Sequence, residues 1–263
     1  RETPFLSPKD TYADGGWDAV KQDAEEKADL LLSLGINVNL APVCDMTSDE
    51  YGFMYDRSFS SDVDMENRYV RTVVETSKSK KLGTVLKHFP GYGNNSDTHT
   101  GIAYDDRDYS EFENTDFKPF YQGIESGADC ILVSHNIVNC MDSEYPASLS
   151  QKVHDILRNE FKFDGVIMTD DLIMDAITDF TGDEAAAVTA AKCGNDLLCC
   201  SSVNTQYPAV LEAVQNGEIP EAQVDASVKR ILKWKQNLGI FSIDTYQKKV
   251  KSTEPTDTVG SEE

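Results

Sequence analysis

Short apolar segments alternate along the chain with longer amphipathic segments. Apolar residues that recur every three to four positions predict amphipathic helices, and short apolar runs rich in β-branched residues predict buried strands. The pattern predicts strands over residues 36–43, 83–89, 129–135, 165–170 and 195–200. It predicts helices over residues 17–34, 62–80, 115–126, 150–160, 183–193, 205–216 and 221–238. Alternation of this kind is typical of parallel strands joined by crossover helices, so we expect an α/β fold.

Polar side chains follow nearly every predicted strand. A (β/α) barrel and a doubly wound sheet both fit the alternation, and both bind ligands at the carboxyl ends of their strands. We favour a TIM-like (β/α) barrel because the polar residues come from nearly all the strands. These residues are Asp45, Lys87, His88, His135, Asn136, Asp170, Asp171 and Ser201.

The number of predicted strands is five, three fewer than a closed barrel of this type contains. Residues 1–16 are predicted to form a loop, and the chain has no initiator Met. We therefore expect the first strands to lie upstream in a longer parent protein, and residues 1–243 to form an N-terminally incomplete barrel domain. Residues 244–263 are polar and acidic and have no periodicity, so a disordered or loosely attached tail is predicted.

Composition narrows the classes of partner. The chain carries 24 Lys and Arg residues against 46 Asp and Glu residues, a formal net charge of −22. Such a charge repels phosphate backbones and anionic lipid headgroups, so nucleic acid and membrane-surface partners are not expected. The sequence has no apolar run near the roughly 18 residues that span a bilayer, so no membrane span is predicted.

Cofactor and metal patterns are missing from the sequence. It contains no Gly-rich phosphate loop after the first strand, no His-Glu-x-x-His motif and no paired-Cys zinc spacing, so neither a cofactor nor a metal is expected. The six cysteines are predicted to be small buried hydrophobic residues and not disulfides. This favours a reducing compartment weakly, and cytoplasmic, cell-envelope and secreted locations all stay open, as does the oligomeric state.

Two of the four histidines stand in the stretch "KHFPGYGNNSDTHTG", residues 87–101. This stretch resembles the Lys-His-Phe-Pro-Gly signature of glycoside hydrolase family 3, in its β-N-acetylhexosaminidase branch, where an Asp-x-His pair follows. The segments "INVNLAPVCDM", "YDRSFSSD" and "GVIMTDDLIMDAI" are similar to three further blocks of that branch in the same order, and the match extends to about Leu238. The resemblance implies a TIM-like barrel with two further strands before the region where this chain starts.

The chain departs from the family pattern at two places in the signature. Three residues, 94–96, separate the second signature glycine from Asp97, where many relatives have four. Tyr92 stands where relatives often have His. Both departures bear on the shape of the loop, and neither removes the Asp-x-His pair.

The resemblance implies roles for three residues in retaining cleavage of a glycosidic bond, which needs a nucleophilic carboxylate and a proton donor. Asp170 ends the predicted strand 165–170 and matches the family nucleophile, whereas Asp171 faces the other way and is expected to support the loop or cap a helix. His99 is the expected acid/base, with Asp97 holding its tautomer and raising its pKa. Without the resemblance, such a loop pair is more often solvated surface.

Four further residues match family positions that bind the sugar: Asp45, Arg57, Lys87 and His88. Taken alone, Arg57 would be predicted to form a surface salt bridge, and Asp45 to cap a helix. His135, at the end of strand 129–135, is predicted to line the pocket or its edge, and His154 is predicted to be simply a helix residue.

The expected activity is that of a retaining exo-β-N-acetylglucosaminidase, acting on small glycans such as cell-wall fragments through a glycosyl-Asp intermediate. The identity of the sugar comes from the resemblance alone. A phosphorylase is the second enzyme hypothesis, because an imidazole is neutral after the first step and does not repel phosphate. A β-glucosidase is disfavoured because such relatives usually take their acid from a second domain. A catalytically silent carbohydrate-binding barrel is the non-enzyme alternative.

Overall fold

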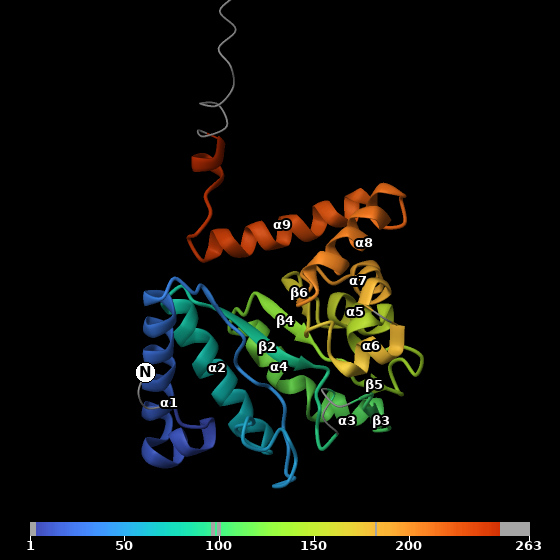
Figure 1. Cartoon of the computed structure of the whole chain (residues 1–263). Coiled ribbons are helices and arrows are strands. Elements are labelled where there is room, and N and C mark those ends of the chain that lie inside the picture. The colour runs from blue at the N-terminus through green and yellow to red at the C-terminus, as the bar shows by residue number, and fades with distance from the viewer. Residues whose placement is uncertain (1–3, 96–97, 99–100, 182, 248–263) are drawn as a thin grey trace, which may run out of the picture.

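The computed structural model describes residues 4–95, 98, 101–181 and 183–247 (Figure 1). Its strands are β1 (Val38–Asn39), β2 (Gly83–Phe89), β3 (Tyr104–Asp105), β4 (Cys130–Val133), β5 (Ile137–Val138) and β6 (Val166–Thr169). Its helices are α1 (Pro8–Ser33), α2 (Val63–Ser79), α3 (Tyr109–Asn114), α4 (Phe117–Glu125), α5 (Gln151–Asp155), α6 (Asp175–Thr181), α7 (Asp183–Lys192), α8 (Val203–Gln215) and α9 (Glu221–Asn237). Strands and helices alternate for most of the chain, as the hydrophobic pattern predicted.

Four strands form one parallel sheet in the order β1-β2-β4-β6. Its register pairs Val38 with Gly83 and Cys130 with both Val85 and Val166. The order follows the chain without reversal, whereas a doubly wound sheet reverses its order at a switch point. The sheet is therefore built as the wall of a barrel, and the doubly wound alternative is wrong. The strands β3 and β5, which the pattern did not predict, form a second, two-stranded parallel sheet.

The predicted strand over residues 195–200 is reduced to a single bridge between Leu197 and Met168. Two backbone N–H groups of these segments donate to side chains and not to the backbone of the neighbouring strand. The carboxylate of Asp196 accepts the N–H of Ile167 at 2.9 Å, and the hydroxyl of Thr169 accepts the N–H of Cys199 at 3.0 Å. Because these side chains satisfy the backbone groups, the segment follows β6 without forming a regular ladder.

The prediction of a loop over residues 1–16 is wrong from Pro8 onward. Helix α1 begins there because the Ser7 hydroxyl accepts the N–H of Asp10 at 3.1 Å and proline suits the first helical turn. The helix is kinked at two glycines, and Gly16 has a φ of 63°. Ser7-Pro8 is a helix start signal, but the glycine pair interrupts the apolar spacing after it, so the helical pattern became visible only from Trp17.

The other helix predictions differ from the structure mainly at the ends of the elements. Helices α3 and α6 were not predicted, because both are shorter than two full turns and carry little periodicity. The helix predicted over residues 150–160 begins as α5, with Ser150 accepting the N–H of Val153 at 3.2 Å, and continues as a π-helical segment over Ile156–Glu160. The predicted helices that correspond to α2, α4, α7, α8 and α9 agree with the structure to within about two residues, whereas the helix predicted over residues 17–34 matches only the end of α1.

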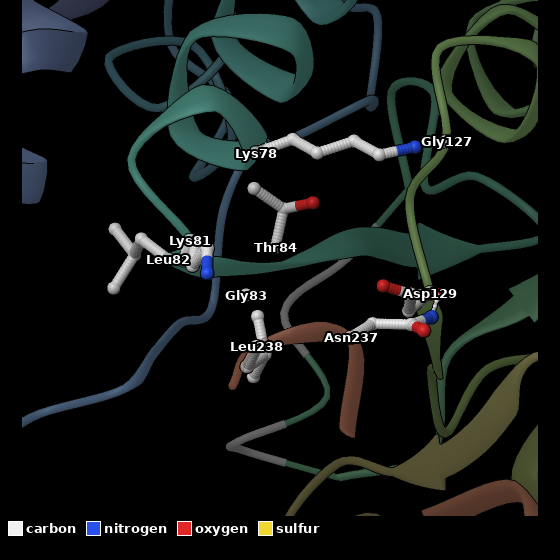
Figure 2. A pocket seen from close by; sticks show the side chains of 9 residues that line it. All are labelled: Lys78, Lys81, Leu82, Gly83, Thr84, Gly127, Asp129, Asn237 and Leu238. Atoms are coloured by element: carbon white, nitrogen blue, oxygen red, sulfur yellow. Dashed lines mark hydrogen bonds between the residues drawn. The ribbon is translucent and has the colours of Figure 1, made fainter. Parts of the chain in front are cut away.

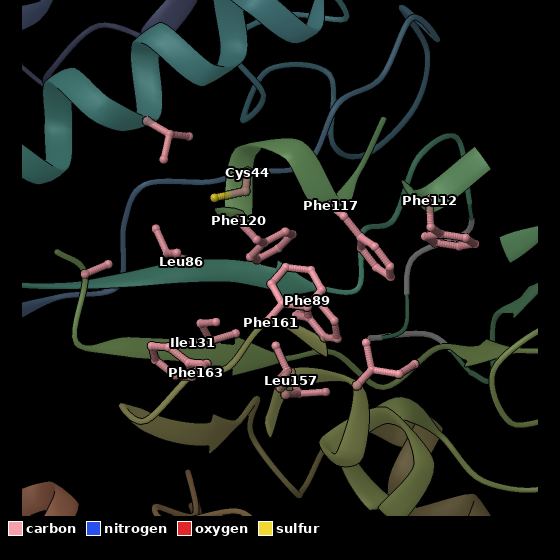
Figure 3. Packing of buried hydrophobic residues seen from close by; sticks show 14 of the residues in the cluster. Cys44, Leu86, Phe89, Phe112, Phe117, Phe120, Ile131, Leu157, Phe161 and Phe163 are labelled. Carbon is pink, nitrogen blue, oxygen red and sulfur yellow. The ribbon is translucent and has the colours of Figure 1, made fainter. Parts of the chain in front are cut away.

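One face of the sheet packs against α2, α4 and the π-helical segment. Phenylalanines dominate this core, and Figure 3 shows them gathered around the end of β2. The ring of Phe89 stacks on Phe117 with centroids 5.5 Å apart and meets Phe120 and Phe161 edge to face at 5.2 and 5.4 Å. Aromatic pairs of this geometry contribute about 0.5–1.5 kcal/mol each beyond the area that they bury. They anchor the strand immediately after His88.

The opposite face of the sheet packs against α9. Cys130 and Leu132 of β4 point to this face, whereas Ile131 and Val133 point to the phenylalanine core, as strand alternation requires. Trp234 of α9 covers the face and lies close to β2, where a Cβ added to Gly83 would stand 3.0 Å from its ring. A larger residue at position 83 would therefore displace α9.

The cysteines are free thiols, and the expectation of burial holds for half of them. Cys44, Cys130 and Cys193 are buried, whereas Cys199 and Cys200 are partly buried. The expectation is wrong for Cys140, which is exposed because it lies in the turn that follows β5.

The first residues of the predicted disordered tail differ from the prediction. Residues 243–247 form a helical turn, and the rings of Phe241 and Tyr246 lie 6.3 Å apart, so the first residues of the predicted tail are structured. The tail residues 248–263 lie outside the described residues. In the described part of the chain, the search for a helix both long enough and apolar enough to cross a membrane found none.

Candidate active site

Asp45, His88 and Arg57 are joined by hydrogen bonds at the carboxyl end of β2. An oxygen of Asp45, Oδ2, lies 3.0 Å from the backbone N of His88 and 2.7 Å from its Nδ1. The other ring nitrogen, Nε2, lies 3.2 Å from Nη2 of Arg57. Because a guanidinium only donates, Nε2 accepts and the ring proton lies on Nδ1, which donates to Asp45. The geometry therefore assigns a neutral His88 held between a carboxylate and a guanidinium.

The carboxylate of Asp45 is fully buried and accepts a third hydrogen bond, from the N–H of Tyr92 at 2.9 Å. Burial alone would raise the pKa of Asp45, but the interaction with His88 and the backbone N–H donors outweigh it, so its pKa is lowered. Asp45 is therefore ionised at neutral pH. The alternatives that the sequence suggested in isolation, a helix cap for Asp45 and a surface salt bridge for Arg57, are both wrong.

Lys87 interacts electrostatically with Asp170 and with two residues of this cluster, Arg57 and Asp45. Burial lowers the pKa of the partly buried Lys87, the charge of Arg57 lowers it further, and the charges of Asp170 and Asp45 raise it. The strands explain this meeting, because parallel strands carry their carboxyl ends to one edge of the sheet. Lys87 belongs to β2 and Asp170 directly follows β6.

The Asp170–Asp171 pair begins the loop after β6. The N–H of Asp170 donates to the carbonyl of Val133 at 3.1 Å, which continues the β4–β6 ladder by one residue. The N–H of Asp171 then donates to Oδ1 of Asp170 at 2.9 Å. The side chain of Asp171 accepts from the N–H of Ile173 at 3.3 Å and from both the N–H and the hydroxyl of Ser201. Asp171 thus ties two loops together, in agreement with the expectation that it supports the loop.

The loop after β2 is attached to the site at Tyr92. The hydroxyls of Tyr92 and Thr98 lie 2.6 Å apart, and both side chains are buried. Asp97 and His99, the predicted acid/base pair, lie outside the described residues, so their roles stay predictions.

Arg107 is a supporting residue of this loop that the sequence analysis missed. Its guanidinium donates to the carbonyl of Gly91 at 3.2 Å and to Asp116 at 2.9 Å. A Cβ at Gly91 would stand 2.3 Å from Asp116, and one at Gly93 would stand 2.9 Å from Arg107. Both signature glycines therefore let the backbone approach these two side chains. The cluster "DDRD" at residues 105–108 was the available signal, but charge clusters in loops are usually solvated.

The other two histidines are buried. His135 contacts the backbone of Asp171, so it lies at the core edge of the site, as predicted. His154 is a buried residue of α5, as expected of a helix residue.

A cavity of about 320 Å³ opens at the opposite, amino-terminal ends of β2 and β4 (Figure 2). Lys78, Lys81, Thr84, Asp129 and Asn237 are among the residues that line it. The predicted catalytic groups follow the carboxyl ends of the strands, so this cavity is separate from the candidate site. A search of the described residues for groups of His, Cys, Asp and Glu that suit a metal ion found none.

Comparisons with known proteins bear on the family to which the chain belongs. The sequence pattern described as "Glycosyl hydrolase family 3 N terminal domain" matches residues 10–234. The chain is 34% identical over 199 residues to a beta-hexosaminidase of Hydrogenovibrio crunogenus, covering 74% of this chain and 55% of that protein. It is 33% identical over 174 residues to a beta-hexosaminidase of Nitrosomonas eutropha, covering 65% and 50%. The chain spans about half the length of these curated relatives.

Solved structures confirm the TIM-like α/β fold. A glycoside hydrolase family 3 beta-N-acetylglucosaminidase from Paenibacillus sp. str. FPU-7 superposes with a TM-score of 0.84 at 28% identity, covering 90% of this chain and 46% of that one. A family 3 glycosyl hydrolase from Mycobacterium smegmatis gives a TM-score of 0.79 at 28% identity, covering 89% and 74%. Because the family pattern matches most of its residues, the chain belongs to glycosyl hydrolase family 3, in the part described as the N-terminal domain.

Proposed function

We propose that the protein is a retaining exo-β-N-acetylglucosaminidase that removes terminal N-acetylhexosamine from small glycans such as cell-wall fragments. The names of the beta-hexosaminidase relatives support the reaction class. The observation that carries the proposal is the carboxylate of Asp170, which directly follows β6, interacts with the charge of Lys87 and has one oxygen held by the N–H of Asp171. Within the described residues, its other oxygen accepts no hydrogen bond.

In the first step, Oδ2 of Asp170 attacks the anomeric carbon. A bond forms between this oxygen and the carbon while the bond to the leaving oxygen breaks, and His99 gives its proton to the leaving oxygen. In the second step, His99 takes a proton from water, the water oxygen bonds to the anomeric carbon, and Asp170 leaves as a carboxylate. Two inversions give net retention. Asp97 orients His99 in both steps.

The substrate-binding cluster consists of Lys87, His88, Arg57 and Asp45. Lys87 and Arg57 are partly buried cations that present N–H donors to sugar hydroxyls. Asp45 is fully buried and acts in this cluster by holding His88, whose ring would otherwise rotate. The Asp45–His88–Arg57 chain fixes the direction of two sugar-binding groups before the substrate arrives, which reduces the entropy lost on binding.

Replacement of Asp170 tests the proposal directly. Asp170→Ala removes the nucleophile, so hydrolysis of nitrophenyl N-acetylglucosaminide is expected to fall by about 10⁴-fold or more while the circular dichroism spectrum is unchanged. The matched control is Asp171→Ala, which leaves the nucleophile in place and is expected to lose less activity. A fluorinated glycoside inactivator is expected to label Asp170, and labelling of Asp171 would overturn the assignment. Proton NMR of the first product is expected to show the β-anomer.

The product mixture separates the alternatives. Sugar 1-phosphate formed at millimolar phosphate would identify a phosphorylase, and faster turnover of nitrophenyl glucoside would identify a β-glucosidase. Sugar binding without turnover would identify a silent carbohydrate-binding barrel. Each of these outcomes contradicts the proposed hydrolase.

Replacement of His99 tests the acid/base role. A nitrophenol leaves with little protonation, whereas a natural sugar leaving group needs a full proton. His99→Ala is therefore expected to lose far more activity on a disaccharide than on the nitrophenyl glycoside, and azide is expected to restore part of the breakdown of the intermediate. Asp97→Ala is expected to give the same pattern more mildly. Equal losses on both substrates without azide rescue would show that the proton comes from another group.

A further inference from the structure

His135 is a fully buried histidine whose two ring nitrogens both have partners. It follows β4, and its Nε2 lies 3.0 Å from the carbonyl oxygen of Asp171, while its Nδ1 lies 2.7 Å from the hydroxyl of Ser148. A carbonyl only accepts, so Nε2 carries the proton and donates it to Asp171. The hydroxyl of Ser148 then donates to Nδ1. Burial lowers the pKa of His135, which agrees with this neutral tautomer.

Asp171, the residue that His135 contacts, is held at every polar group. Its carbonyl accepts from His135 and also from the N–H of Met174 at 3.1 Å. Its side chain accepts from the N–H of Ser201 at 3.2 Å and from the Ser201 hydroxyl. Fixing the carbonyl and the side chain fixes the backbone torsions of Asp171. The remaining polar group, its N–H, is thereby directed at Oδ1 of Asp170.

The direction of this N–H decides how the carboxylate of Asp170 is oriented. A carboxylate on an aspartate rotates easily about its last bond, which is a broad, roughly two-fold torsion. The hydrogen bond of 2.9 Å from Asp171 to Oδ1 restricts that rotation and leaves Oδ2 as the oxygen without a partner among the described residues. The charge of Asp170 also acts on His135, so the two residues lie close together.

We propose that His135 is a positioning residue that holds the carboxylate of Asp170, through Asp171, in the orientation from which Oδ2 attacks the anomeric carbon. This inference rests on the proposed function of Asp170 as the nucleophile. His135 does not touch the substrate, because it is fully buried behind the loop. Its neutral form supplies a donor to the carbonyl of Asp171 without burying a further charge, which would be costly at a fully buried position.

His154 is a matched control for a purely structural role. It is also a buried histidine, 1% exposed, and its Nδ1 lies 2.7 Å from a backbone carbonyl, that of Ser150. Its Nε2 lies 4.0 Å from Sγ of Cys193, and it also interacts with the side chain of Asn195. Among the described residues, it forms no hydrogen bond with Asp170 or Asp171. Loss of either histidine is expected to destabilise the fold, but only loss of His135 is expected to change the orientation of the nucleophile.

The test compares His135→Leu, His135→Gln and His154→Leu in the protein. His135→Leu removes the donor to Asp171, and a misplacement of the reacting group by about 1 Å lowers the rate by roughly 100-fold, so kcat is expected to fall by about that factor. KM is expected to change by less than about threefold, because the sugar-binding residues are untouched. His135→Gln keeps an N–H donor near the position of Nε2, so its kcat is expected to be about tenfold higher than that of His135→Leu.

The rate of labelling by a fluorinated glycoside reports the attack by Asp170 itself. It is expected to fall in parallel with kcat in His135→Leu, while the activity ratio between disaccharide and nitrophenyl glycoside stays unchanged because the acid/base is intact. His154→Leu is expected to lower the melting temperature comparably and to leave kcat unchanged. A His135→Leu protein that loses thermal stability but keeps full kcat would overturn the inference.

Two further measurements keep the test decisive. If His135→Leu does not fold, Ser148→Ala is tested in its place, because loss of the partner of Nδ1 allows the His135 ring to turn. The inference would then be overturned if Ser148→Ala and His135→Gln both kept full kcat and unchanged labelling rates. Asp170→Ala separates the two proposals. Activity in Asp170→Ala would refute the proposed function, whereas an inactive Asp170→Ala with a fully active His135→Leu would refute the positioning role alone.

Discussion

Two buried carboxylates, Asp45 and Asp196, sit in different parts of the sheet and are used differently. Asp196 lies beside β6 and accepts from Arg158 at 2.6 Å, Arg230 at 2.9 Å, Ser227 at 2.7 Å and the N–H of Ile167 at 2.9 Å. Its partners join β6, the π-helical segment and α9 to one another. Among the described residues, Asp45 accepts from His88 and Tyr92 alone, at the carboxyl end of β2.

The difference lies in where each set of hydrogen bonds ends. Both arginines around Asp196 donate to its carboxylate, and Arg158 also donates to the carbonyl oxygens of Phe163 and Gly165, so this network holds packed elements together. The network around Asp45 passes through a neutral imidazole to Arg57, a partly buried residue beside Lys87 and Asp170. A buried charge with strong partners is therefore not sufficient to indicate a functional site. What distinguishes Asp45 is that its hydrogen bonds lead to Arg57, beside Lys87 and Asp170 at the carboxyl ends of the strands.

Asp196→Ala is expected to have the largest effect on stability. The change leaves the guanidinium groups of Arg158 and Arg230 without their carboxylate, and breaking a buried ion pair from one side lowers the free energy of unfolding by about 3–5 kcal/mol. Urea unfolding measures the loss. Asp29→Ala is the control, because its pair with Lys80 is on the surface and is expected to contribute less than about 1 kcal/mol. Equal losses in both variants would contradict the role of Asp196.

Asp45→Asn is expected to affect activity more than stability. The amide has the shape of the carboxylate but lacks its charge, so it no longer fixes the proton of His88 on Nδ1 and the link to Arg57 is lost. Removal of such a supporting carboxylate is expected to lower kcat/KM by about 10–100-fold, which corresponds to roughly 1.4–2.7 kcal/mol. The free energy of unfolding is expected to fall by only about 1–3 kcal/mol. A large loss of stability with unchanged kcat/KM would place Asp45 in the same class as Asp196.

The pH dependence of stability tests the network around Asp196 through its neighbour His154. Burial is the main cause that lowers the pKa of His154, so the folded protein holds this ring neutral while the unfolded chain protonates it below about pH 6.5. The contribution of the neutral ring is complete above that pH and is lost as the pH falls. The stability of the wild type relative to His154→Leu is expected to decrease below pH 6.5 by up to about 1.4 kcal/mol per pH unit. Parallel pH curves for the two proteins would contradict the buried neutral state.

Much of the architecture could be predicted from the sequence because the signals are local. Apolar spacing located β2, β4, β6 and most helices, and the polar residues after the strands located the edge where Asp45, His88 and Asp170 meet. The predictions that were wrong also have physical causes. The segment at residues 195–200 reads as a strand, but the side chains of Asp196 and Thr169 replaced its ladder partners. The start of α1 was hidden by a glycine kink.

The sequence by itself determined the parallel α/β order and the family, because hydrophobic period and motif spacing are properties of the chain alone, and it also supplied the candidate catalytic residues. Only the tertiary structure showed that Asp45 accepts hydrogen bonds from His88 and that Asp171 ties two loops together. It also showed that Asp116 and Arg107 leave no room for a Cβ at the two signature glycines. Some of these contacts join residues that are far apart along the chain, and others depend on which rotamer a single side chain adopts. Neither distance in space nor rotamer is encoded in any local pattern, since both follow from how whole elements pack.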